Sequence, residues 1–144
     1  MLCEEMDRRI REVIAAHEPD AAAVYIYGSE ARGEATARSD VDVGLLLKHD
    51  PPKHVAGEGG LEAFSRTHRF DLASKLTAEL EREVDLVVLN LAPVDLSFRV
   101  IRDGRLVVEG DASRRVTFEV AVRREYRDLL PLLRICRRMP RRAG

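Results

Sequence analysis

The stretch AAAVYIYGSEARGEATARSDVDVGLLL, residues 21–47, decides the fold that we expect for this chain. It opens with a short apolar and aromatic run over residues 22–27, which is typical of a buried strand and ends at a Gly-Ser turn. A second apolar run over residues 41–47 predicts another buried strand, and residues 30–34 between them suit a short helix. The stretch therefore predicts strand, turn, helix and strand in close succession.

Helices and a third strand are expected on either side of this stretch. Residues 4–17 and 61–82 carry apolar residues at helical spacing, and we expect a break in the second helix near residues 67–69. Residues 84–89, VDLVVL, suit a third strand. Two strands joined through a helix usually run parallel, so the strands over 41–47 and 84–89 should lie side by side and start at the same end.

The rest of the chain completes a mixed sheet covered by helices. Residues 94–101 suit a helix and residues 105–109 a small edge strand. From Ser113 onward apolar residues recur at helical spacing, which predicts a long final helix that packs across the core and is kinked or interrupted at Pro131. The fold class is therefore α/β, a small mixed sheet flanked by helices with a long C-terminal helix.

Length and composition favour one soluble domain. With 144 residues, 45% of them apolar, we expect a single domain over 1–144, with its core over about 1–110 and a C-terminal helix and basic tail over 111–144. No run approaches the roughly 20 apolar residues of a membrane helix, so a cytoplasmic location is expected. The connection over residues 48–60 is rich in Gly and Pro and should be mobile.

Charge is distributed unevenly along the chain. Residues 1–113 carry 14 Lys and Arg against 22 Asp and Glu, a net −8, whereas residues 114–144 carry 10 Arg against 3 acids, a net +7. A basic end can bind nucleic acid or an acidic partner, but it is as often a solvated helix face. Direct nucleic-acid binding through this end stays open and is not the favoured reading.

The chemistry is concentrated in the Asp-x-Asp that opens the strand over 41–47. Side chains two apart on a strand point to one face, so Asp40 and Asp42 present both carboxylates to the same place. Mg²⁺ prefers oxygen ligands and is typically held by one or two carboxylates together with substrate phosphates. Ser-Asp before a strand is also ordinary turn chemistry, so the argument depends on what surrounds the pair.

Three features around the pair favour a site for phosphate and metal. Gly28 lets backbone N–H groups approach phosphate oxygens, and the Ser29 hydroxyl adds a donor. Arg32 can offer a planar fork to a phosphate, although it could equally pair with a surface acid, and Ser39 is a further candidate for nucleotide binding. Asp85 is an acid in an otherwise apolar strand and should lie beside Asp42.

Three carboxylates suffice to hold two Mg²⁺ ions. In such a pair one ion activates the attacking hydroxyl and the other offsets charge on departing pyrophosphate. Asp40, Asp42 and Asp85 are therefore the predicted catalytic and metal-binding residues, and Asp85 is the candidate for activating the nucleophile.

These residues carry a family resemblance. Gly28-Ser29, the ten-residue gap and Asp40-x-Asp42 resemble the signature of the DNA polymerase β-type nucleotidyltransferases, and the short length resembles the minimal members, in particular MntA-type antitoxins. Asp103-Gly104 and Tyr126-Arg127-Asp128 resemble that group's C-terminal pattern. The resemblance implies a polymerase β-like fold, ATP as substrate with Mg²⁺, and transfer of AMP to a tyrosine of a partner HEPN-domain ribonuclease toxin.

Two alternatives remain open at this stage. One is transfer of a nucleotide to a small molecule such as an aminoglycoside, although little chain follows the core to build a wall for a small acceptor. The other is an antitoxin that acts by binding alone. Asp40, Asp42 and Asp85 argue against it, because three clustered carboxylates would repel one another unless they held a metal ion.

Overall fold

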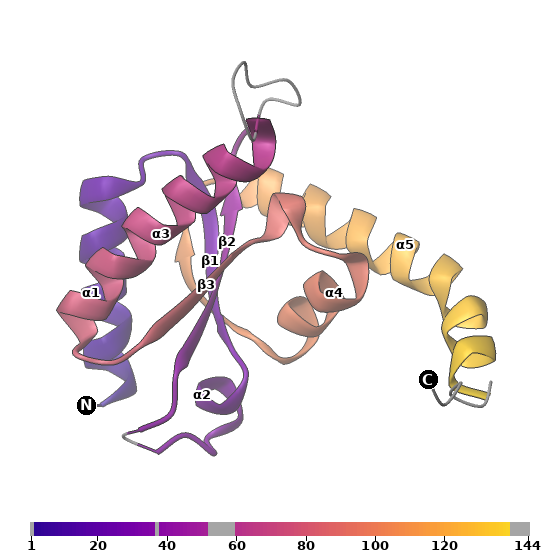
Figure 1. Ribbon diagram of the computed structural model, residues 1–144, viewed down its shortest axis with the longest axis horizontal. Helices are drawn as coiled ribbons and strands as arrows, with labels where there is room; N and C mark the ends of the chain where they lie inside the picture. Colours follow the sequence, from indigo (N-terminus) through magenta and orange to yellow (C-terminus); the bar gives the residue numbers. More distant parts are fainter. Residues whose placement is uncertain (1, 37, 52–59, 139–144) are drawn as a thin grey trace.

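The computed structural model describes residues 2–36, 38–51 and 60–138, built around a four-stranded mixed sheet in the order β3-β2-β1-β4 (Figure 1). The strands are β1 (Ala21–Tyr27), β2 (Val41–Leu47), β3 (Val84–Val88) and β4 (Arg105–Glu109). Strand β1 pairs antiparallel with β2 and with β4, whereas β2 pairs parallel with β3. The predicted parallel neighbours and the predicted edge strand are both confirmed.

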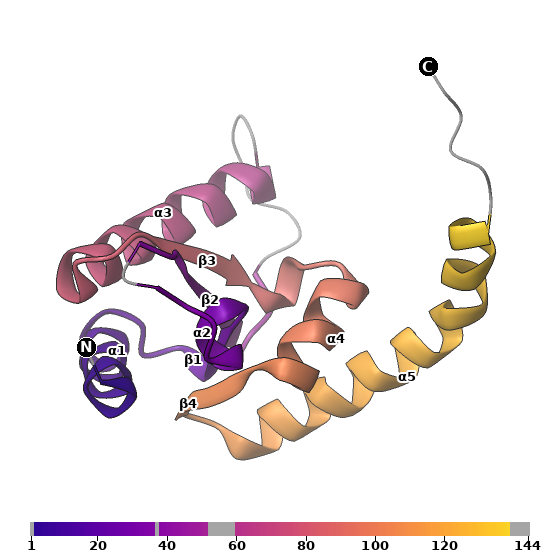
Figure 2. The same cartoon turned by 90° about the horizontal axis from the view of Figure 1, so that it is seen from below.

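Two helices cover one face of the sheet. Helices α1 (Cys3–His17) and α3 (Gly60–Leu80) lie together on this face, as the two views of the ribbon show (Figures 1 and 2). Alternate side chains of the strands point toward α1 and α3. Together with the apolar faces of these two helices they form the larger hydrophobic core. Its fully buried members include Ile10, Ile26 and Leu76.

The other face carries a smaller core and the site. A 3₁₀ turn, η1 (Leu89–Leu91), leads into α4 (Val94–Asp103), and α5 (Ala112–Arg138) packs against both α4 and β1. Gly44 of β2 faces α4, and a methyl group there would meet Val100 Cγ1 at 3.2 Å and Leu89 at 3.4 Å. The missing side chain therefore lets α4 lie close to the sheet.

One expectation about helix interruptions is wrong, and another is wrong in part. Helix α3 runs without a break through residues 67–69, because residues 61–80 contain neither Pro nor Gly and every backbone N–H can join the helical ladder. Pro131 was expected to kink or to interrupt α5. The helix continues through Pro131, so the interruption is wrong, whereas Figure 2 shows the helix curving toward its C-terminal end.

The final helix also does not pack across the core over its whole length. Its 27 residues extend about 40 Å, whereas the outermost of four strands lie only about 15 Å apart, so the second half of α5 passes beyond the sheet (Figure 2). Val122 is its one buried residue in the part that the structure describes, and Leu132 and Ile135 are 59% and 53% exposed.

Two further expectations from the sequence concern the connection after β2 and membrane-spanning helices. Most of the connection expected to be mobile, residues 52–59, lies outside the described residues. Within the described ranges, no helix is both long enough and apolar enough to span a lipid bilayer.

Candidate active site

The turn after β1 is shaped by Gly28. Its φ of 69° and ψ of −146° lie in a region that residues with a side chain rarely adopt. A Cβ built on Gly28 would overlap the carboxylate of Asp42 on the neighbouring strand. Glycine is thus required here for its backbone conformation and because Asp42 packs directly against the turn.

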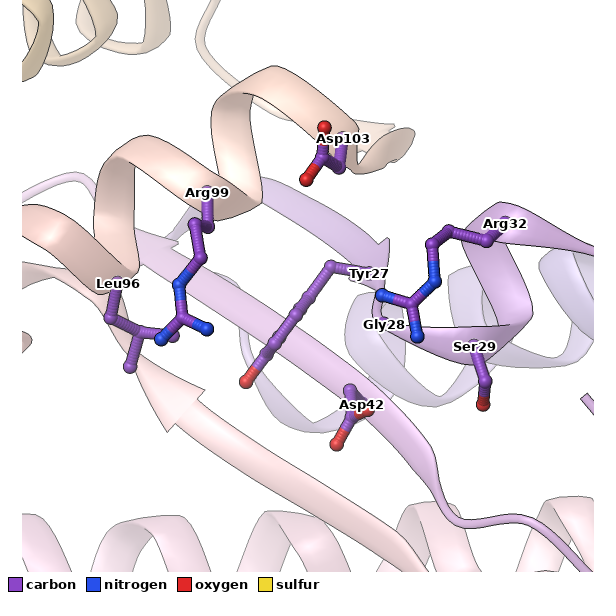
Figure 3. Close-up of a pocket in the computed structure, with 8 residues that line it drawn as sticks. All are labelled: Tyr27, Gly28, Ser29, Arg32, Asp42, Leu96, Arg99 and Asp103. Carbon is purple, nitrogen blue, oxygen red and sulfur yellow. The ribbon is translucent and has the colours of Figure 1, made fainter. Parts of the chain in front are cut away.

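A single helical turn, α2 (Ser29–Arg32), follows Gly28. The Arg32 N–H donates to the Gly28 carbonyl, and Gly33 ends the turn in the left-handed region at φ 70°. The short helix predicted over 30–34 is confirmed, beginning one residue earlier. Ser29 and Arg32 lie around one hollow with Asp42 (Figure 3).

The register of the sheet brings the acids together. Asp42 is opposite Tyr27 on β1 and opposite Asp85 on β3, so all three side chains point to the face that carries α4. Burial raises the pKa of Asp42, and the charges of Asp85 and Asp40 raise it further, while Arg32 lowers it. The predicted neighbourhood of Asp42 and Asp85 is confirmed, and Asp40 acts on the same carboxylate.

The three carboxylates do not by themselves form a closed ligand cluster. Among the residues that the structure describes, no three His, Cys, Asp or Glu side chains are close enough together to hold a metal ion. Asp40 and Asp85 are exposed, whereas Asp42 is half-buried. The pKa of Asp42 is nevertheless raised, first by burial and then by the like charges of Asp85 and Asp40. A divalent cation relieves that repulsion, and the all-oxygen donor set fits Mg²⁺.

A cavity of about 330 Å³ opens at this corner of the molecule (Figure 3). Its wall from the turn and β2 contains four of the predicted residues, Gly28, Ser29, Arg32 and Asp42, and Tyr27 stands beside them. Asp40, Asp85 and Ser39 are not part of the wall, so the predicted site divides into residues that line the cavity and residues that lie next to it. The remaining lining residues come from α4: Leu96, Arg99 and Asp103.

Sequence reasoning missed the contribution of α4. Leu96, Arg99 and Asp103 are spaced by three and four residues, which places them on one face of α4. The helix was predicted only over residues 94–101, so Asp103 lies beyond its predicted end. That spacing was the available signal, but only the packing of α4 on β1 shows which face meets the site. Arg99 also lowers the pKa of Tyr27, which burial and the charges of Asp42 and Asp85 raise to about 12.

Arg82 is a second residue that the sequence did not single out. It lies just after α3, and its Nη2 donates to the carbonyl oxygens of Ser39 at 2.7 Å and Thr36 at 3.2 Å. Its Nη1 pairs with Glu30 of α2, and the two side chains are only 16% and 11% exposed. Arg82 therefore ties the connection between α2 and β2, which carries Asp40, to the end of α3.

Ser39 and Arg32 make local contacts in addition to their predicted roles. The Ser39 Oγ accepts the Thr36 N–H at 3.0 Å, so the hydroxyl stabilises the turn before Asp40. Arg32 Nε lies 3.0 Å from Glu34 Oε2, an exposed pair of the kind that contributes little to stability. Figure 3 shows the Arg32 guanidinium facing the same hollow as Asp42, so its fork remains directed at the cavity.

A glycine turn packed on an aspartate of the next strand, with another acid in register beside it, is the arrangement of a nucleotidyltransferase. The chain matches the family model described as Polymerase beta, Nucleotidyltransferase over residues 9–113, and it belongs to that family. The fold class inferred from the sequence is thereby confirmed.

One relative and two solved structures are similar to this chain. The chain is 27% identical over 99 residues to the protein adenylyltransferase MntA of Shewanella oneidensis, and the match covers 69% of this chain and 62% of MntA, less than two thirds of that relative. A solved toxin-antitoxin structure with AMP-PNP has the same fold, with a TM-score of 0.72 and 22% identity. The match covers 90% of this chain and 94% of the matched chain. A second solved structure, a complex of tri-AMPylated Shewanella oneidensis HEPN toxin with MNT antitoxin, has a TM-score of 0.70 and 20% identity. The match covers 94% of this chain and 95% of the matched chain.

Proposed function

We propose that this chain is a Mg²⁺-dependent nucleotidyltransferase antitoxin that transfers AMP from ATP to a tyrosine of a partner HEPN-domain ribonuclease toxin and so neutralises it. The observation that carries the proposal is the position of Asp42. Its carboxylate lies against the backbone of Gly28 and has Asp85 as its register partner, so an acid and a phosphate-binding turn face one cavity.

Each residue of the cavity has a role in this proposal. Backbone N–H groups of the turn at Gly28 and the Ser29 hydroxyl bind the triphosphate, and Arg32 pairs with one of its oxygens. Asp40, Asp42 and Asp85 would hold two Mg²⁺ ions. Bound there, magnesium supplies positive charge to the phosphates and lowers the pKa of the attacking hydroxyl.

AMP transfer is a substitution at the α-phosphorus of ATP, with pyrophosphate as the leaving group. The acceptor oxygen bonds to the α-phosphorus of ATP, the bond from that phosphorus to the bridging oxygen breaks, and pyrophosphate leaves. Asp85 takes the proton of the acceptor hydroxyl, because its exposed carboxylate stands on the outer strand of the sheet, where an acceptor can approach.

A protein acceptor agrees with the shape of the site. Asp40 and Asp85 are exposed, and the cavity is bounded on one side by α4 alone, which leaves room for a macromolecular surface. The relative MntA is a protein adenylyltransferase, which supports a protein as the acceptor. The tri-AMPylated HEPN toxin, in complex with an antitoxin of the same fold as this chain, supports a toxin as that protein.

The test is labelling of the partner encoded beside this chain. With α-³²P-labelled ATP and Mg²⁺, we expect the chain to label that protein and to abolish its ribonuclease activity. Asp42→Asn should abolish labelling, whereas Asp128→Asn, the same change at an exposed position of α5, should leave it intact.

Three results would overturn parts of the proposal. Labelling retained in Asp42→Asn would remove Asp42 from the mechanism. Neutralisation of the partner by Asp42→Asn without labelling would make this an antitoxin that acts by binding alone. A chain that labels an aminoglycoside and not the partner would be a small-molecule enzyme.

A further inference from the structure

A second cavity, of about 380 Å³, lies between α4 and α5. Its wall carries Asp95, Arg99 and Arg102 from α4 and Tyr126, Leu133 and Arg137 from α5. Arg99 also lines the cavity at Asp42, so the two hollows adjoin. The volume is within the range of small-ligand sites in proteins.

Two of the three arginines are available to a ligand. Arg102 is engaged, because its Nε and Nη2 donate to the two carboxylate oxygens of Asp103 at 2.9 and 2.8 Å. Arg99 and Arg137 have no ion-pair partner within the described part of the chain. Two guanidinium groups from different helices thus face one hollow, a combination that favours the doubly charged phosphate of a nucleotide over a single carboxylate.

The remaining wall is chemically specific. Asp95 would repel a bare phosphate, but a carboxylate beside a phosphate-binding group is a good acceptor for the hydroxyls of a ribose. Leu133 and the ring of Tyr126 supply an apolar wall for a base. Tyr126 is held in place because it stacks on Phe98 of α4, with the ring centroids 3.7 Å apart and the planes 4° from parallel.

We propose that the cavity between α4 and α5 binds a nucleoside monophosphate unit, with its phosphate at Arg99 and Arg137 and its ribose at Asp95. Because Arg99 is shared with the cavity at Asp42, a nucleotide bound here stands next to the site of transfer. Such a unit has two sources, free AMP or an AMP already attached to the acceptor. The second source rests on the proposed function, whereas the binding site itself does not.

The first experiment measures binding without any transfer. The full chain is saturated with a non-hydrolysable ATP analogue and Mg²⁺, and AMP is then titrated in a calorimeter. We expect one AMP to bind beside the ATP analogue. Its affinity should fall about tenfold in Arg137→Gln, which loses a charge-assisted contact, and should stay unchanged in the matched control Arg134→Gln at an exposed position of α5. No binding of AMP to the wild-type chain, or equal affinities in the two variants, would overturn the proposal.

Asp95 separates a nucleotide site from a simple anion site. Asp95→Ala should weaken AMP binding while strengthening binding of inorganic phosphate, since it removes both a ribose acceptor and a negative charge. If Asp95→Ala strengthens binding of both probes, the cavity is an anion site only and the nucleotide assignment is wrong.

A second experiment identifies the source. The mass of the acceptor is followed during transfer by wild type, Arg137→Gln and Arg134→Gln. If the cavity takes an acceptor-linked nucleotide, Arg137→Gln adds the first AMP at the normal rate and adds later ones at least about tenfold more slowly. If the ligand is free AMP, the distribution of products is the same in all three. An acceptor unlabelled even by wild type refutes the proposed function and leaves the calorimetric result unaffected.

Discussion

Replacing Gly28 by Ala tests the interlock between the turn and Asp42. The substitution places a side chain at φ 69° and ψ −146°, where strain amounts to about 1–3 kcal/mol. The new methyl group also overlaps the Asp42 carboxylate, which must move by about 1 Å to regain an ordinary carbon–oxygen contact. A displacement of that size at a reacting centre lowers the rate by about 100-fold.

Gly33→Ala is the matched control, because Gly33 also has a positive φ but a methyl group there meets no atom within 4 Å. It should lower the free energy of unfolding by about 1 kcal/mol and leave the transfer rate nearly unchanged. Urea denaturation and initial rates of acceptor labelling measure the two effects. A Gly28→Ala chain whose labelling rate stays within threefold of wild type would refute the interlock.

The remaining predictions concern the clamp that Arg82 forms on the connection between α2 and β2, the carboxylate of Asp42 and the hydroxyl of Tyr27. Arg82→Gln leaves Glu30 largely buried without its partner, so the free energy of unfolding should fall by about 3 kcal/mol in urea denaturation, and a loss under 0.5 kcal/mol would contradict the clamp. Asp42 has a raised pKa, so its ionised form destabilises the fold above the usual value of 3.8. Asp42→Asn should therefore melt at a higher temperature than wild type at pH 7 in chelator, the difference should vanish below pH 3.8, and an unchanged melting temperature at pH 7 would contradict the repulsion. Tyr27→Phe should label within about threefold of wild type, because a hydroxyl of pKa about 12 is no base at neutral pH, and a 100-fold loss would give it a catalytic role.

The central part of the site could be predicted because it depends on local patterns. Gly28-Ser29 at the end of one apolar run and Asp42 at the start of the next determine their own geometry once the runs pair as strands. Asp85 followed from the strand–helix–strand order of residues 41–89, because two strands joined through a helix usually run parallel and side by side.

The rest depends on which surfaces meet after the chain has folded. Arg82 has the sequence context of an ordinary solvated residue after a helix, and only the approach of α3 to residues 36–39 gives it partners. Arg99 belongs to an amphipathic helix whose inward face is set by the open space at Gly44. The length of α5 was evident, but how far it passes beyond the sheet depends on the number of strands beneath it.

The register of β2 determines both which of its side chains enter the core and where its acid lies in the site. Along β2, Asp42 and Gly44 point toward α4, whereas Val41, Val43 and Leu45 point toward α1 and α3. Sliding β2 by a single residue would drive the Asp42 carboxylate into the larger core and turn the valines toward α4, which would cost several kcal/mol for the buried charge alone. Completing the hydrophobic interior and aligning the reactive acids are consequently one event, so a correctly assembled molecule needs no later adjustment of these strands to become competent.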